Sequence, residues 1–150
     1  MPIHSATHTS KRQMTVYPAT EQDVRSSAIG LRLRQFNYGF VGEYPVELPI
    51  RLNAKDSTGC VVGGLRAIVF LYWLRIEVLF VDESQRGMGF GTALLFEAER
   101  VAREAGAKNA ALETFEFQGP GFYAKHGYVE TGRIANYAGE FYLVTMAKSL

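Results

Sequence analysis

Apolar and polar residues alternate over residues 46–52, which predicts a strand with one buried face. The next apolar stretch is too rich in valine, isoleucine and aromatic residues for a helix. We divide it into two antiparallel strands, about 60–70 and 73–82, with a turn between them. Gly63 and Gly64 within the first of these strands indicate a bulge or the close approach of another backbone segment. The middle of the chain is therefore predicted to be an antiparallel sheet.

The period becomes helical from Phe90 onward. Leu94, Ala98 and Ala102 fall on one face of the predicted helix, and Gly106 is suited to end it. This pattern predicts a helix that buries one apolar face against the sheet.

A strand over 109–117 follows this helix, and the strand–helix–strand order makes it parallel to the strand over 73–82. A short helix at 120–127 and two closing strands, 128–134 and 140–150, complete the pattern. The predicted fold is α/β: a mixed sheet of about six to seven strands, with an antiparallel N-terminal half and one central βαβ unit.

The N-terminal third has a weaker pattern. Residues 1–12 are polar and without period, and we expect a flexible tail there. A short strand is predicted at 14–18. Thr20, with Asp23 three residues later, approximates the signal that begins a helix, and one or two helical segments follow with an interruption near Gly30.

Composition narrows the class of protein. With 16 basic and 15 acidic residues in 150, the chain has no excess charge for nucleic acid. The single Cys60 has no histidine or cysteine at metal-ligand spacing, so we expect neither a disulfide nor a bound metal. The longest apolar stretch is broken by Arg75 and Glu77, and the N-terminus lacks a signal-peptide pattern. We expect one cytoplasmic domain over 13–150, without membrane contact.

The segment QRGMGFGT, residues 85–92, places Gly87, Gly89 and Gly91 where a strand becomes a helix. Unpaired N–H groups at a helix start attract anions, glycine lets a phosphate come close, and Arg86 adds positive charge. The alternative is a glycine-rich turn that eases helix–sheet packing. A nucleotide-triphosphate loop would need a lysine here, and the glycine spacing is not the G-x-G-x-x-G of dinucleotide folds.

Two motifs together resemble the GNAT N-acetyltransferase superfamily. Arg86, Gly89 and Gly91 occupy the family's acetyl-coenzyme A loop positions, with Val81 five residues before the arginine. Downstream, GFYAKHGY at 121–128 resembles the family's F-Y-x-k-x-G-F/Y segment. The resemblance implies a GNAT-like sheet whose central parallel strands splay apart.

The resemblance also implies that acetyl-CoA binds as the acetyl donor, with its pantetheine arm between the splayed strands. A backbone N–H at a strand bulge near Phe80 and Val81 would polarise the thioester carbonyl. The implied contacts to acetyl-CoA come from the strand end and the glycine loop: Leu79, Phe80, Val81, Arg86, Gly87, Met88, Gly89, Phe90, Gly91 and Thr92.

Tyr123 matches the family tyrosine that gives a proton to the coenzyme A sulfur, and its alternative role is that of a core aromatic residue. We assign the base to Glu77, if partial burial raises its pKa, with a salt bridge to Arg75 as the structural alternative. Glu113, Glu116 and ordered water are the other candidates for the base.

Two neighbours of the tyrosine need separate interpretation. Glu116 stands where many members carry an asparagine, which puts that cofactor contact in doubt and makes Gln118 the alternative. His126 falls in the last helical turn before Gly127, where a capping role is favoured over catalysis.

We therefore predict an acyltransferase of the EC 2.3.1 type that moves the acetyl group of acetyl-CoA directly to an amine of a small molecule in a ternary complex. The alternatives are a protein lysine or N-terminal acetyltransferase and a non-catalytic acetyl-CoA sensor. The resemblance also carries the expectation of a homodimer formed through the C-terminal strands. Candidate contacts to the acceptor are Asn37, Tyr38, Tyr72, Trp73 and Tyr137.

Overall fold

The computed structural model describes residues 14–150, in two units that meet in sequence between Glu43 and Tyr44. The flexible tail expected at 1–12 lies outside the described residues, and the single domain over 13–150 stays a prediction.

The first unit is helical, with α1 (Glu21–Arg25) and α2 (Ala28–Val41). The predicted start is confirmed as a capping box: the Asp23 N–H donates to the Thr20 hydroxyl at 3.2 Å, and the Thr20 N–H donates to the Asp23 carboxylate at 2.8 Å. The break between the helices lies at Ser27, whose φ is 52°, and not at Gly30, which falls inside α2.

The strand predicted at 14–18 is wrong, because the segment has no regular structure. A strand persists only where a neighbouring strand pairs with its backbone, and this segment has none. A sequence pattern of five residues does not show whether a partner strand is present.

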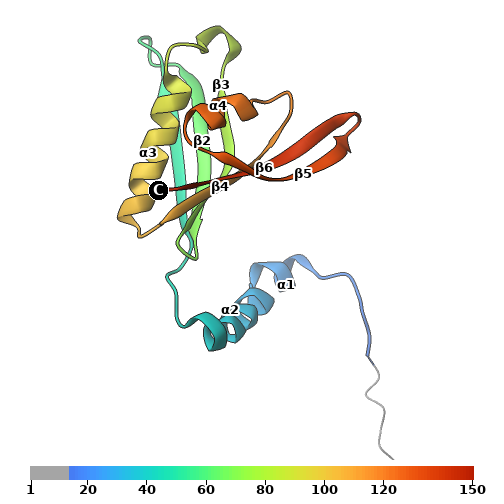
Figure 1. The fold of residues 1–150 in the computed structure, drawn as a ribbon. Coiled ribbons are helices and arrows are strands. Elements are labelled where there is room, and N and C mark those ends of the chain that lie inside the picture. The colour runs from blue at the N-terminus through green and yellow to red at the C-terminus, as the bar shows by residue number, and fades with distance from the viewer. Residues whose placement is uncertain (1–13) are drawn as a thin grey trace, which may run out of the picture. The chain divides into compact units, whose positions relative to one another are not determined.

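The second unit is built on a six-stranded sheet with the order β1-β2-β3-β4-β6-β5 (Figure 1). Neighbouring strands are antiparallel except for the parallel pair of β3 and β4. The mixed sheet predicted from the sequence is thereby confirmed. Its strands are β1 (Leu48–Lys55), β2 (Val61–Phe70), β3 (Trp73–Val81), β4 (Asn109–Phe115), β5 (Val129–Ala138) and β6 (Phe141–Ser149).

Local signals explain the central hairpin. Leu71 and Tyr72 form its two-residue turn with positive φ, which matches the twist of the flanking strands. A side chain at Gly63 would place its Cβ 2.8 Å from the Phe80 carbonyl oxygen, so the close approach predicted for the paired glycines is confirmed. The hairpin therefore holds β2 tightly against β3.

Helix α3 (Phe90–Glu104) connects β3 to β4 and packs on β1, β2 and β3. Its buried face includes Leu94, Ala98 and Ala102, as the period predicts. Gly106, at φ 89°, ends it as predicted. The second unit also contains the single-turn η1 (Glu83–Gln85) and α4 (Pro120–Lys125).

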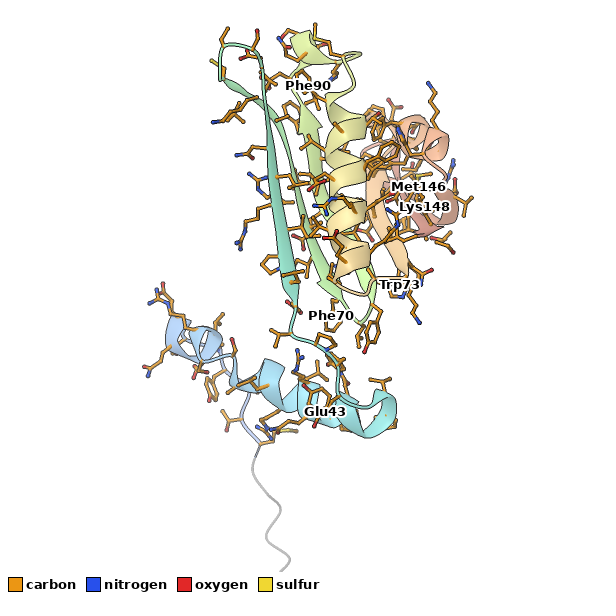
Figure 2. All side chains as sticks on the ribbon, turned by 90° about the vertical axis from the view of Figure 1, so that its left-hand side faces the viewer. Glu43, Phe70, Trp73, Phe90, Met146 and Lys148 are labelled. Atoms are coloured by element: carbon orange, nitrogen blue, oxygen red, sulfur yellow. The ribbon has the colours of Figure 1, made fainter. Side chains whose placement is uncertain are left out.

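One charged residue lies on the buried face of α3, which the apolar period did not predict. Glu99 is only 1% exposed. Its carboxylate accepts hydrogen bonds from the Lys148 ammonium at 3.0 Å, the Tyr128 hydroxyl at 3.1 Å and Arg103 at 3.2 Å. Burial, together with this carboxylate, raises the pKa of Tyr128. The cluster ties α3 to β6, and Figure 2 shows Lys148 beside the helix.

Replacing Glu99 by alanine leaves the Lys148 ammonium and the Tyr128 hydroxyl without their partner. We expect Glu99→Ala to lower the free energy of unfolding by about 3 kcal/mol, as for other broken buried ion pairs. Urea unfolding measures this change. Glu104→Gln, which removes an exposed ion pair with Arg100 from the same helix, is the control and should leave the midpoint almost unchanged. Equal midpoints for the two variants would contradict the prediction.

Candidate active site

A cleft of about 860 Å³ opens where β3 and β4 separate. Its walls are the second half of β3, the glycine loop with the start of α3, the end of β4 and the helix α4. All the residues predicted to contact acetyl-CoA line it except Met88, whose side chain is exposed. The structure thus brings two sequence motifs that are distant in the chain to one site.

The separation of the strands is visible in their register. β3 pairs with β4 from Trp73 opposite Asn109 to Ile76 opposite Leu112, and then the pairing stops. The predicted splay is therefore confirmed. From Glu77 onward, the edge of β3 that faces β4 has backbone groups without a strand partner.

The bulge lies three to four residues earlier on β3 than predicted. On β2, Arg66 stands opposite Val78 and the next residue, Ala67, stands opposite Ile76, so Glu77 is the extra residue of β3. The prediction of a bulge at Phe80–Val81 is wrong, because those residues pair regularly with Gly64 and Gly63. The bulge therefore coincides with the point where β3 leaves β4.

The glycine loop ends at a bare helix start. Gly89 is the N-cap of α3 with φ 86°, and no side chain caps the helix. None of the N–H groups from Gly89 to Thr92 has a hydrogen-bond partner within the described part of the chain. These four donors lie at the positive end of the helix dipole, an arrangement that is able to bind an anion.

Gly91 has a different role from Gly89. A Cβ at Gly91 would lie 3.4 Å from the Phe122 ring, whereas one at Gly89 would meet nothing within 4 Å. Helix packing therefore explains Gly91, while the open space around Gly89 is what a bound group needs.

Arg86 places a positive charge on the wall of the cleft. Its Nε–H donates to the Val81 carbonyl oxygen at 3.1 Å, and its guanidinium carbon lies 5.8 Å from the centre of the Phe80 ring. These contacts hold the guanidinium beside the end of β3 and next to the bare helix start.

Tyr123 lies on α4 and lines the cleft while being only 9% exposed. Its hydroxyl has no hydrogen-bond partner in residues 14–150, where every fully sealed polar side-chain atom has one. The hydroxyl oxygen is therefore open to the cleft. Burial of the ring raises the pKa of Tyr123 to about 12, so the phenol keeps its proton at neutral pH.

Two carboxylates, Glu77 and Glu113, line the cleft, whereas Glu116 does not. Both are exposed, so the partial burial expected for Glu77 is not found. Neither forms an ion pair with a described residue, and the alternative salt bridge between Glu77 and Arg75 is absent. The cleft therefore contains two carboxylates that are not ion-paired, in addition to the guanidinium of Arg86.

Gln118 also lines the cleft, at the turn that follows β4. Its side-chain oxygen accepts a hydrogen bond from the Phe115 N–H at 3.0 Å. This bond fixes the side chain, and its amide nitrogen has no partner among the described residues.

His126 caps α4, in agreement with the predicted role. Its Nδ1 lies 2.8 Å from the Phe122 carbonyl oxygen, which can only accept, so Nδ1 donates. The Thr92 hydroxyl lies 3.1 Å from the other ring nitrogen, Nε2, to which it donates when the ring is neutral. Thr92 belongs to the first turn of α3, so this pair joins the glycine loop to the helix that carries Tyr123.

The residues predicted to contact the acceptor are scattered. Tyr72 and Trp73 lie at the end of β3 away from the cleft, and Figure 2 shows Trp73 far from Phe90, which lines the cleft at the start of α3. Their assignment to the acceptor site is corrected accordingly. Asn37 and Tyr38 belong to α2 in the separately described first unit, so their role stays a prediction.

Tyr137 lies next to the cleft on β5, with its ring 5.7 Å from that of Phe115. Phe117, which was not among the predicted contact residues, lines the cleft. Its i, i+2 spacing from Phe115 in the strand predicted at 109–117 was the available signal, although Phe117 itself lies in the turn that follows β4.

Within residues 14–150, no group of three or more His, Cys, Asp and Glu side chains could hold a metal ion. In the same part of the chain, no helix is long and apolar enough to cross a membrane.

Residues 16–128 match the acetyltransferase (GNAT) family, and the chain belongs to that family. It is similar to blasticidin-S acetyltransferase from Streptomyces morookaense, with 41% identity over 85 residues that cover 56% of this chain. The match spans 62% of that relative's length.

Solved structures show the same fold. An acetyltransferase from Bacillus cereus superposes with a TM-score of 0.81 and 30% identity, over 91% of this chain and 98% of that one. A Bacillus anthracis structure in complex with acetyl coenzyme A has a TM-score of 0.63 and 21% identity, over 75% of this chain and 68% of that one.

The raised pKa of Tyr123 can be measured by the ultraviolet absorbance of phenolate. We expect Tyr123→Phe to remove an ionisation centred near pH 12, because burial disfavours the charged phenolate in the folded protein. Because the pKa is higher in the folded protein than in the unfolded chain, the folded state holds this proton more tightly. The resulting contribution to the free energy of unfolding is complete below about pH 10 and is lost as the pH rises through 12. In urea-unfolded protein, the ionisation that Tyr123→Phe removes should be centred near pH 10. A loss near pH 10 from the folded protein would refute the assignment.

Proposed function

We propose that this protein is an N-acetyltransferase that transfers the acetyl group of acetyl-CoA directly to an amine of a small molecule in a ternary complex. The observation that carries the proposal is the convergence, in one cleft, of a split parallel strand pair, a bare helix start and an unpartnered tyrosine hydroxyl. Family membership supports the same reaction.

The cleft suits acetyl-CoA in its donors and its charge. The N–H groups of Gly89 to Thr92 and the guanidinium of Arg86 would bind the diphosphate, where the open space at Gly89 admits it. The free edge of β3 offers peptide groups to the amides of the pantetheine arm. Acetyl-CoA supplies the acetyl thioester, and the protein binds and orients it.

Tyr123 is proposed as the acid. As a C–N bond forms to the amine and the C–S bond breaks, its hydroxyl gives a proton to the departing sulfur and recovers one from the amine nitrogen through the base or water. Its pKa of about 12 keeps this proton in place until a thiolate begins to form. Glu77, exposed to solvent in the cleft, is proposed to take the ammonium proton directly or through water.

The acceptor is proposed to be a cationic small-molecule amine. Glu77 and Glu113 place two carboxylates without ion-pair partners in the cleft, and these attract an ammonium group. The similarity to a blasticidin-S acetyltransferase favours a small molecule over a protein lysine or N-terminus. Asn37 and Tyr38 remain proposed contacts from the first unit.

Location and assembly are parts of the proposal. The free and exposed Cys60 suits a reducing compartment, which supports a cytoplasmic location. A homodimer formed through the C-terminal strands, and the absence of nucleic-acid partners, stay predictions.

A panel of small amines tests the function, with release of coenzyme A thiol as the measurement. Turnover with one or more of them is expected. Tight binding of acetyl-CoA with no turnover across the panel would instead favour a non-catalytic sensor, and turnover only with peptides would favour a protein acceptor.

Gly89→Val tests the anion site. The added side chain fills the space in front of the bare helix start, and we expect the affinity for coenzyme A in calorimetric titration to fall at least about tenfold. Gly59→Val is the matched control, because Gly59 has φ 88°, has nothing within 4 Å of an added Cβ, and lies in the turn between β1 and β2. Both variants take on similar backbone strain, but Gly59→Val should bind coenzyme A normally. Equal affinities would remove the proposed anion site.

Tyr123→Phe keeps the buried ring and removes the proton donor. We expect kcat to fall by about 100-fold or more, with the KM for acetyl-CoA changed less than about twofold. Tyr142→Phe, which removes a phenol hydroxyl from β6 outside the cleft, is the control. Wild-type turnover in Tyr123→Phe would assign the proton to another donor or to water.

A further inference from the structure

Four aromatic rings gather beside the cleft, and we call them the aromatic wall: Phe115, Phe117, Tyr137 and Phe141. The rings of Phe115 and Phe117 stack at 5.3 Å, with only 4° between their planes. Tyr137 packs at 5.7 Å from Phe115, and Phe141 lies edge-on to Phe117 at 5.0 Å. The wall is therefore an ordered surface assembled from the end of β4, from β5 and from the start of β6.

Much of this surface is open to solvent. Phe117 is 59% exposed, Tyr137 57% and Phe141 39%. Contiguous exposed apolar surface rimmed by polar residues is typical of a binding site. Because each ring already packs on another ring of the wall, a ligand would not have to order them, which lowers the entropic cost of binding.

The wall is continuous with the cleft. Phe117 belongs to both, and Glu113 lines the cleft two residues before Phe115 on the same strand. Leu112 and Thr114 are buried on the other face of β4, so Glu113 and Phe115 share the open face. A carboxylate without an ion-pair partner therefore stands next to a stack of rings.

We propose that the aromatic wall selects acceptors that carry a flat, unsaturated ring close to the amine. The inference rests on the proposed function and names its substrate class. The ring of the acceptor would lie against Phe117 and Tyr137, while its ammonium group is attracted by Glu113 and Glu77 at the cleft. Aromatic contacts of this kind favour a flat ring over a saturated one of the same size.

Charge argues against a second copy as the occupant of the wall. Glu113 lines the adjoining cleft and Glu140 precedes Phe141 in the chain, so a two-fold contact through the wall would place carboxylates of both copies in one interface. A cationic ligand is attracted to the same charges.

The test compares benzylamine with cyclohexylmethylamine, two primary amines of one shape class that differ in ring unsaturation. For each protein, the ratio of their kcat/KM values is measured, so the different basicity of the amines cancels between proteins. The ratio is kcat/KM for benzylamine divided by kcat/KM for cyclohexylmethylamine. We expect it to be about twofold to tenfold lower in Phe117→Leu than in the wild type, and likewise lower in Tyr137→Leu. Trp73→Leu, which removes an exposed ring at the far end of the sheet, should keep the wild-type ratio.

A binding experiment separates this inference from the proposed function. Saturation-transfer NMR with each amine, in the presence of coenzyme A, reports ring contact without turnover. A preference for benzylamine that Phe117→Leu abolishes supports the wall even if no acetyl group is transferred, and the proposed function then fails alone. If acetyl groups are transferred to both amines and Phe117→Leu leaves the ratio of their kcat/KM values unchanged, the proposed role of the aromatic wall is wrong and the proposed function is retained.

Sedimentation velocity measures the oligomeric state and so tests whether a second copy of the chain occupies the aromatic wall. A wild-type monomer, or a dimer that Phe117→Leu leaves intact, agrees with the inference. A dimer that dissociates in Phe117→Leu while the amine preference is unchanged would assign the wall to a second copy and overturn it.

Discussion

The divergence of two parallel strands at mid-length is the constraint on which the rest of this structure depends. After Ile76 and Leu112, β3 and β4 no longer pair, and the extra residue Glu77 shifts the register of β3 at that point. The sheet tolerates the opening because β3 stays paired with β2 to its end, and β4 stays paired with β6 along its whole length. The backbone groups left open are the polar surface that a ligand can satisfy.

The opening is useful only if the groups around it are held still, and buried polar contacts do this. The Glu99 carboxylate fastens α3 to Lys148 on β6 and to Tyr128 just after α4. At the start of the same helix, Thr92 is joined to His126 at the end of α4. The helix start and the helix that carries Tyr123 are thus fixed to each other and to the sheet, which is the preorganisation that electrostatic binding and catalysis require.

Features encoded locally could be predicted, and features encoded by distant pairing could not. The central hairpin, the βαβ unit and the glycine loop each have a signal within a few residues, and each was found. The position of the bulge depends on the register between Arg66 and Val78, which no local pattern contains. The burial of Glu99 depends on Lys148, 49 residues further on. Trp73 was misassigned because aromatic content does not tell which end of a sheet a ring occupies.

The same distinction separates the two halves of the site. The half proposed for acetyl-CoA is made largely of backbone, on one continuous stretch from β3 through the loop into α3, so a short motif is enough to encode it. The half proposed for the acceptor is made of side chains from β4, β5 and β6, which meet only because β6 inserts between the other two strands in the sheet. Substitutions on any of those strands can change the acceptor surface without disturbing the loop. Members of one family can therefore keep the donor site while their acceptors diverge, and the acceptor has to be argued from the assembled surface.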